Sequence, residues 1–223
     1  IAGTVEANAT AGRGGNIDIS GQQGVAMEST GRVSPTGING GTIALNSSAG
    51  AVQVSGQISA NAVEGRGGSV AIAAATQPSV AAGARISASG AKGGGSASVD
   101  AVENIKLESD SKLEAAGAVG GAIALAAEHG SVEIKGTLDA TGDSLAGGTI
   151  KIAARSDITL GDTSVLDVSG RRGGETWIEA RKGTTLASGL IDAYGHKGPG
   201  GEVLLLGPPV RLVRNGTINA SGY

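Results

Sequence analysis

The 223-residue sequence predicts an all-β protein: a right-handed parallel β-helix of about eight coils, with 26–27 residues and three strands in each coil. Three observations support this prediction. Pairs of adjacent glycines return at a nearly constant interval, three short alternating segments recur between them, and the remaining residues are too few for a helix. A fixed period of this kind is typical of a solenoid, in which each repeat packs on its neighbours.

The glycine pairs set the period, because their second members are 26 or 27 residues apart throughout the chain. The pairs are Gly14-Gly15, Gly40-Gly41, Gly67-Gly68, Gly94-Gly95, Gly120-Gly121, Gly147-Gly148, Gly173-Gly174 and Gly200-Gly201. Glycine accepts positive φ angles and allows two backbones to approach closely. We therefore expect each pair to form a tightly constrained corner of the coil.

The segment after each pair alternates β-branched apolar residues with small or polar ones, as in residues 42–45 and 149–152. A period of two with one apolar side indicates a strand with one buried face. A shorter alternation follows, such as residues 132–134, and a third precedes the next pair, usually as apolar-polar-Ala, such as residues 138–140. These segments supply three strands per coil, and right-handed winding is the usual hand of a parallel crossover.

Other solenoids fit this sequence less well. A left-handed hexapeptide helix needs a shorter repeat, a leucine-rich repeat needs its Leu and Asn pattern, and a calcium-binding nonapeptide repeat needs Gly and Asp at offsets that these pairs lack. No break in composition divides the chain, so residues 1–223 are expected to form a single β-helix segment. Because the repeats start at Ile1 and stop at Tyr223 without polar caps, we expect this segment to be a fragment of a longer repeat shaft.

Composition argues against two classes of partner. The formal net charge is −3, which does not favour nucleic-acid binding. The sequence has no apolar run of 18 residues, so we expect no membrane insertion. Cysteine is absent, which is compatible with export of an unfolded chain.

Carboxylates recur at the middle position of the third segment, where alternation predicts that they point outward and stack coil upon coil. This acidic stripe consists of Glu6, Glu114, Asp139, Asp167 and Asp192. This stripe is a candidate for binding a cation or a partner. The alternative, which we favour, is that it is a solvated face that keeps the shaft soluble. No loop supplies clustered ligands, so neither a metal site nor a cofactor is predicted.

Basic residues collect just before the glycine pairs and predict an intermittent cationic ridge along one corner. The ridge consists of Arg13, Arg66, Lys92, Arg171, Arg172, His196 and Lys197, and Tyr194 stands beside it. Such a ridge suits an acidic or neutral polysaccharide, or the acidic stripe of another copy of the chain. The alternative is that corner loops simply tolerate charge.

Catalysis is not expected. Enzymes need convergent groups in a concave site, and coils of near-minimal length leave no long loops to wall a cleft. The two histidines, His129 and His196, fall in different corners of the predicted coil. We therefore predict that the protein is not an enzyme.

Three stretches of the sequence resemble a known group of repeats: residues 166–174 (LDVSGRRGG), residues 190–203 (LIDAYGHKGPGGEV) and residues 218–222 (INASG). They resemble repeats of filamentous-haemagglutinin-like exoproteins of bacterial two-partner secretion, and within that group are most similar to large biofilm-matrix adhesins of the Pseudomonas kind. The resemblance extends over all eight coils, but it assigns no function to an individual residue.

The resemblance implies an extracellular or cell-surface shaft, exported through an outer-membrane two-partner transporter by a secretion domain outside this chain. It further implies adhesion between cells, or between cell and matrix, in a biofilm, through exopolysaccharide or another copy of the adhesin. Two alternatives remain open: the stalk of a contact-dependent toxin and, with less support, a carbohydrate-active β-helix enzyme.

Overall fold

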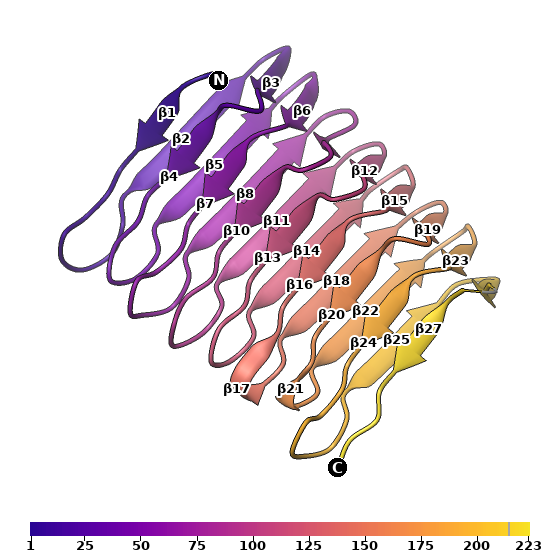
Figure 1. Ribbon diagram of the computed structural model, residues 1–223. Coiled ribbons are helices and arrows are strands. Elements are labelled where there is room, and N and C mark those ends of the chain that lie inside the picture. Colours follow the sequence, from indigo (N-terminus) through magenta and orange to yellow (C-terminus); the bar gives the residue numbers. More distant parts are fainter. Residues whose placement is uncertain (214) are drawn as a thin grey trace.

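The computed structural model describes residues 1–213 and 215–223, which form a three-sided parallel β-helix (Figure 1). These residues contain 27 strands and no helix. Three sheets of eight, eight and nine strands run the length of the stack, and each strand pairs in parallel with its counterpart one coil away. The predicted parallel β-helix of about eight coils is confirmed.

Sheet I carries the longest strands, which follow the glycine pairs. They are β2 (Asn16–Gly21), β5 (Thr42–Ser47), β8 (Ser69–Ala74), β11 (Ser96–Ala101), β14 (Ala122–Ala127), β18 (Thr149–Ala154), β22 (Glu175–Ala180) and β25 (Glu202–Leu206). Their register is continuous: Ile123 pairs with Ile150 and Leu125 pairs with Ile152. Alternation buries these apolar residues and turns the residues between them outward.

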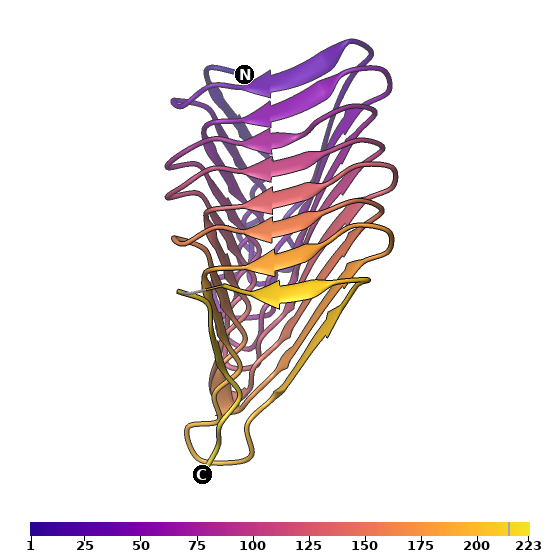
Figure 2. The same cartoon turned by 90° about the vertical axis from the view of Figure 1, so that its right-hand side faces the viewer.

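Sheet II is formed by the second, shorter segment of each coil. Its strands are β3 (Gly24–Met27), β6 (Ala51–Val54), β9 (Ser79–Val80), β12 (Ile105–Leu107), β15 (Val132–Ile134), β19 (Ile158–Leu160), β23 (Thr185–Ala187) and β26 (Val210–Leu212). Figure 2 shows this sheet facing the viewer, with the other two sheets descending on either side to a narrow corner at the bottom.

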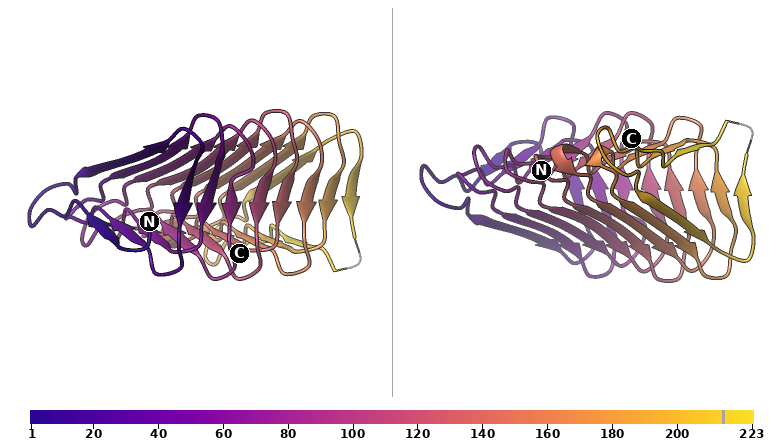
Figure 3. Two further views of the ribbon diagram at one scale, coloured as in Figure 1. Left: turned by 90° about the horizontal axis from the view of Figure 1, so that it is seen from above. Right: turned by 90° about the horizontal axis from the view of Figure 1, so that it is seen from below.

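Sheet III closes the triangle. Its strands are β1 (Thr4–Glu6), β4 (Arg32–Ser34), β7 (Gln57–Ser59), β10 (Arg85–Ser87), β13 (Lys112–Glu114), β16 (Thr137–Asp139), β20 (Val165–Asp167), β24 (Leu190–Asp192) and β27 (Thr217–Asn219). Each of these strands has three residues, of which the middle one points inward. Figure 3 shows the coils following one another along a single axis.

The core is a set of aliphatic rows that run along this axis. In sheet III, Leu113, Leu138, Leu166 and Ile191 are consecutive register partners and are fully buried. Toward the narrow corner the inward residue is usually alanine, as at Ala115 and Ala140, because only a small side chain fits where sheets I and III converge. One coil therefore has no core of its own and depends on its neighbours.

The glycine corner lies between sheets III and I, and its pairs are required by close backbone approach. The N–H of Gly148 donates to the carbonyl oxygen of Ala140 at 2.7 Å, which closes the corner loop. A Cβ atom added at Gly148 would collide with the carbonyl oxygen of Gly121 in the preceding coil, and one at Gly147 would collide with that of Val168 in the next coil. None of the paired glycines has a φ in the left-handed region, so close backbone approach, and not positive φ, is what requires glycine at these corners.

A small fourth sheet was not predicted. It consists of β17 (Gly142–Ala146) and β21 (Gly170–Arg172), which pair in parallel across two neighbouring corner loops with a shift in register. Other corner loops are linked by isolated bridges, such as Gly90 to Gly117. The loops are thus extended and bonded coil to coil, but their sequences show no alternation that would reveal a strand.

Candidate interaction surfaces

The acidic stripe lies on the outer face of sheet III. Glu114, Asp139, Asp167 and Asp192 are consecutive register partners, and all four side chains are half-buried. Glu6 lies apart on β1, separated from them by a run of serines at the same position in β4, β7 and β10. The structure therefore brings four of the five predicted carboxylates together.

Three of these carboxylates also have a local structural role. Asp139 accepts hydrogen bonds from the backbone N–H of Thr141 at 3.1 Å and from its hydroxyl at 2.8 Å. Asp167 accepts from the N–H of Ser169 at 2.9 Å, and Asp192 accepts from the N–H of Tyr194 at 3.0 Å. Each aspartate thus holds the backbone where the chain leaves sheet III, as in an Asx turn.

Lys112 joins two carboxylates of the stripe from the first position of its strand. Its Nζ lies 3.1 Å from Glu114 Oε2 and 2.8 Å from Asp139 Oδ2. Partial burial tends to lower the pKa of Lys112, but the hydrogen bonds and charges of Asp139 and Glu114 outweigh burial and hold that pKa above its ordinary value. Burial likewise opposes ionisation of Asp139, yet hydrogen bonds from Lys112 and Thr141 leave its pKa below the ordinary value. The pair is therefore ionised at neutral pH.

The cationic ridge is divided into two groups along the glycine corner. Arg13, Arg66 and Lys92 are exposed in the first, third and fourth coils, and the remaining cations lie in the last two coils. The corner loops between the groups, residues 115–121 and 140–148, contain no Lys, Arg or His. Arg13 braces the next coil, because its Nε donates to the carbonyl oxygen of Gly40 at 3.2 Å and its Nη2 donates to Thr42 Oγ1 at 2.9 Å.

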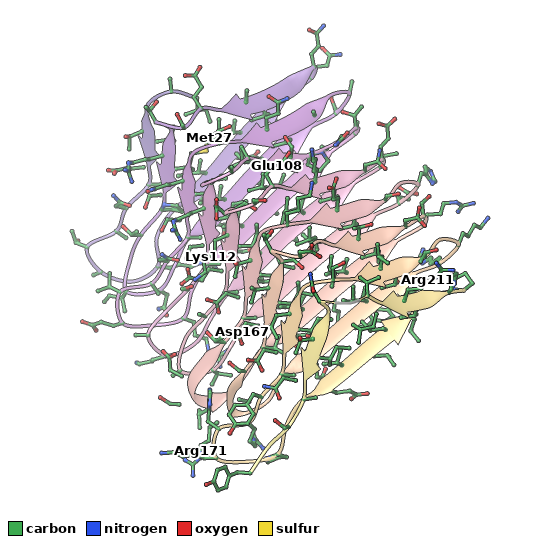
Figure 4. All side chains as sticks on the ribbon, turned by 45° about the vertical axis from the view of Figure 1, so that its right-hand side comes forward. Met27, Glu108, Lys112, Asp167, Arg171 and Arg211 are labelled. Atoms are coloured by element: carbon green, nitrogen blue, oxygen red, sulfur yellow. The ribbon has the colours of Figure 1, made fainter. Side chains whose placement is uncertain are left out.

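The second group, here called the corner cluster, consists of Arg171, Arg172, Tyr194, His196 and Lys197. The backbone brings its two coils together: the N–H of His196 donates to the carbonyl oxygen of Gly170 at 2.8 Å, and that of Lys197 donates to Arg171 at 3.1 Å. The rings of Tyr194 and His196 meet edge to face, with centroids 5.0 Å apart. Both arginines, His196 and Lys197 are exposed, and Arg171 projects from the tip of the corner in Figure 4.

A shallow open groove of about 620 Å³ crosses the ends of the sheet I strands and was not predicted. Its floor includes Ala73, Ala126 and Ala153, with Asp100 between the first two. Burial raises the pKa of Asp100, and a hydrogen bond from Ser98 offsets part of that effect. The sequence signal is alanine at the fifth position of three long strands, β8, β14 and β18, where the missing side-chain volume leaves a depression.

Trp177 points outward from β22 in sheet I, as alternation predicts. The Nζ of Lys151, its register partner one coil earlier, lies 5.9 Å from the ring centroid, which is cation–π geometry. The indole therefore has a partner within the chain and stands apart from the corner cluster.

Among the described residues, no group of three or more His, Cys, Asp or Glu side chains is placed to hold a metal ion. Nor does any helix long and apolar enough to cross a membrane occur within residues 1–213 and 215–223. No protein-family model, curated protein or solved structure matches the chain.

Proposed function

We propose that this chain is a structural and adhesive shaft of a secreted bacterial adhesin, which promotes attachment between cells, or between cell and matrix, in a biofilm. One observation carries the proposal: the coils stack in unbroken register, so that three hydrogen-bonded ladders and a continuous aliphatic core run the length of the chain. Bending or breaking this stack would stretch all three ladders and expose core rows to water. Such a fold is a stiff spacer that presents outward side chains at regular intervals along its surface.

The repeat sequence supports the same proposal, because residues 166–174, 190–203 and 218–222 resemble those of two-partner-secretion exoproteins. The proposal includes an extracellular or cell-surface location and export through an outer-membrane two-partner transporter. Both rest on the resemblance.

The corner cluster is the proposed contact with exopolysaccharide. Guanidinium and ammonium groups form charge-assisted hydrogen bonds to the carboxylates and hydroxyls of a sugar chain, and the nearby Tyr194 ring offers an apolar surface for a sugar face. Its exposed cations come from two adjacent coils, so an extended chain along the corner would meet all of them.

We expect the double variant Arg171→Glu/Arg172→Glu to lose about tenfold or more of its retention on immobilised anionic matrix polysaccharide, because two charge-assisted contacts become repulsive. The matched control is Arg155→Glu/Lys182→Glu, which changes net charge equally at adjacent exposed positions of another corner. Far-ultraviolet circular dichroism verifies that both variants fold. Equal retention by the wild type and both double variants would contradict polysaccharide binding by the corner cluster.

A further inference from the structure

Charge is segregated along the outer face of sheet III. In its N-terminal half the first strand position carries Arg32 in β4 and Arg85 in β10. In its C-terminal half the third strand position carries Asp139, Asp167 and Asp192 in β16, β20 and β24. Lys112 and Glu114 occupy both positions of β13, the fifth of the nine strands, and Figure 4 shows Lys112 and Asp167 on this side of the molecule.

Side-chain size is segregated in the same way. The N-terminal half has small residues at the third position, Ser34, Ser59 and Ser87, beside Arg32, Gln57 and Arg85. The carboxylates of the C-terminal half stand beside larger or branched residues at the first position, Thr137, Val165 and Leu190. Between β4 and β24, one half of the face is thus basic with small neighbours, and the other half is acidic with larger or branched neighbours. Glu6 lies outside this range, on β1.

These two halves are complementary about β13. A two-fold axis along β13 turns a second copy end for end and places β4 opposite its β24, β7 opposite its β20 and β10 opposite its β16. Arg32 then lies diagonally across from Asp192, Gln57 from Asp167, and Arg85 from Asp139, and each pair occurs twice. We propose that the outer face of sheet III is a self-association surface through which two copies of this chain pair with their shafts antiparallel.

The contact geometry is compatible with the side chains present. Under this symmetry equivalent strand positions face each other, so Arg32 lies over Leu190 and Asp192 lies over Ser34. The arginine stem packs on the aliphatic side chain, its guanidinium reaches across to the carboxylate, and the serine leaves space for that carboxylate. Lys112 shows that a first-position cation reaches such acids, since it bonds Glu114 in its own strand and Asp139 in the next.

The two-fold axis places Lys112 of one copy opposite Lys112 of the other copy. The ammonium group leans from β13 toward Asp139 of β16, so the symmetry-related group leans the opposite way and the two cations separate. A parallel arrangement relates the two copies by an axis along the shaft, which sets the third position of each strand over the first position of the same strand. Asp167 and Asp192 would then face Val165 and Leu190, and the arginines of β4 and β10 would face serines, so the opposite charges of the two halves would not meet.

The contact is small. Seven strands, β4 to β24, span about 30 Å and the three residues of each strand span about 10 Å, which gives roughly 300 Å² per copy and 600 Å² in total, so the pairing is weak and depends on its charges. An interface of this size, bounded by exposed ion pairs, should weaken strongly as salt screens its charges. The inference rests on the proposed function in one respect: antiparallel pairing is the arrangement that shafts from two facing cells would adopt.

Sedimentation equilibrium of the 223-residue chain tests the pairing. We expect a dimer at 20 mM NaCl that dissociates at 500 mM NaCl. Arg85→Glu should raise the dissociation constant at least tenfold, and so should Asp139→Arg, whereas the control Arg155→Glu should leave it within twofold. An equimolar mixture of the Arg85→Glu and Asp139→Arg variants should regain dimers, because each swapped charge then meets its opposite. A monomer at every concentration in low salt, or a mixture that does not associate although both variants fold, would overturn the pairing.

Orientation is tested independently, with no need for the Asp139 variant to fold. Because the chain has no cysteine, Thr30→Cys can carry a single nitroxide at an exposed position beside β4. Antiparallel copies place the two labels six coil spacings apart, about 30 Å. A pulsed-EPR distance below about 20 Å would instead indicate parallel pairing and contradict the inference.

Cell aggregation separates this inference from the proposed function. If the purified chain stays monomeric while cells displaying it still aggregate, the sheet III pairing is wrong and the adhesive role stands. If the dimer forms but displayed shafts neither aggregate cells nor hold matrix, the pairing stands and the adhesive role is wrong.

Discussion

Gly148→Ala is expected to destabilise the protein by about 3 kcal/mol or more, which corresponds to a fall in Tm of about 6–12 °C. The added methyl group would collide with the carbonyl oxygen of Gly121, which is backbone and cannot rotate away. Relief requires two coils to separate, and this would weaken the hydrogen bond from the N–H of Thr149 to the carbonyl oxygen of Gly121 and the ladders on both sides. Thermal unfolding followed by circular dichroism measures the effect.

Gly93→Ala is the matched control, because Gly93 lies in an equivalent corner loop immediately before a glycine pair. A Cβ atom at this position would find its nearest neighbour, the carbonyl oxygen of Val119, 3.4 Å away, which is an ordinary contact. We expect its Tm to lie within about 2 °C of the wild type. If the two substitutions shift Tm equally, close backbone approach does not explain the glycine pairs.

Leu138→Ala is expected to cost about 2–5 kcal/mol in the free energy of unfolding, because it leaves a cavity in the middle of an aliphatic row. Leu138 is fully buried between its register partners Leu113 and Leu166. Neighbouring coils are held at the strand spacing by their hydrogen bonds, so they cannot collapse into the space. The shift of the denaturant midpoint measures the loss.

The control for this truncation is Ile218→Ala, in the same row of sheet III but in the last coil. Ile218 is 39% exposed and contacts only one neighbouring coil, where Ile191 is its register partner. Its truncation should cost less than about 1 kcal/mol. Equal losses at the two positions would show that the row does not act as a continuous core.

The repeat made the fold predictable. A Cβ atom at Gly148 or at the equivalent position of another coil would collide with backbone, so glycine is required once in every coil and its spacing in the sequence gives the period. Alternation then identifies the inward residues, such as Leu138 and Ile150, and the outward ones between them. The stacking of Glu114, Asp139, Asp167 and Asp192 follows from the same two signals.

Features that depend on contacts between coils could not be predicted. The pairing of β17 with β21 arises from backbone bonding between loops that have no strand pattern. The groove beside Asp100 arises from missing side-chain volume in adjacent coils. The sequence also contained no sign that Arg13 braces the next coil through Gly40 and Thr42.

Pulsed EPR on the double variant Thr42→Cys/Glu202→Cys, labelled with nitroxides at high salt and low protein concentration, tests whether successive coils form one stiff, in-register stack. Both positions begin strands of sheet I, six coil steps apart in the same outward row. A stiff stack gives one narrow distance distribution centred near 29 Å, lengthened by a few ångströms for the label arms. A broad distribution, or a centre far from this value, would show that the coils do not form such a stack.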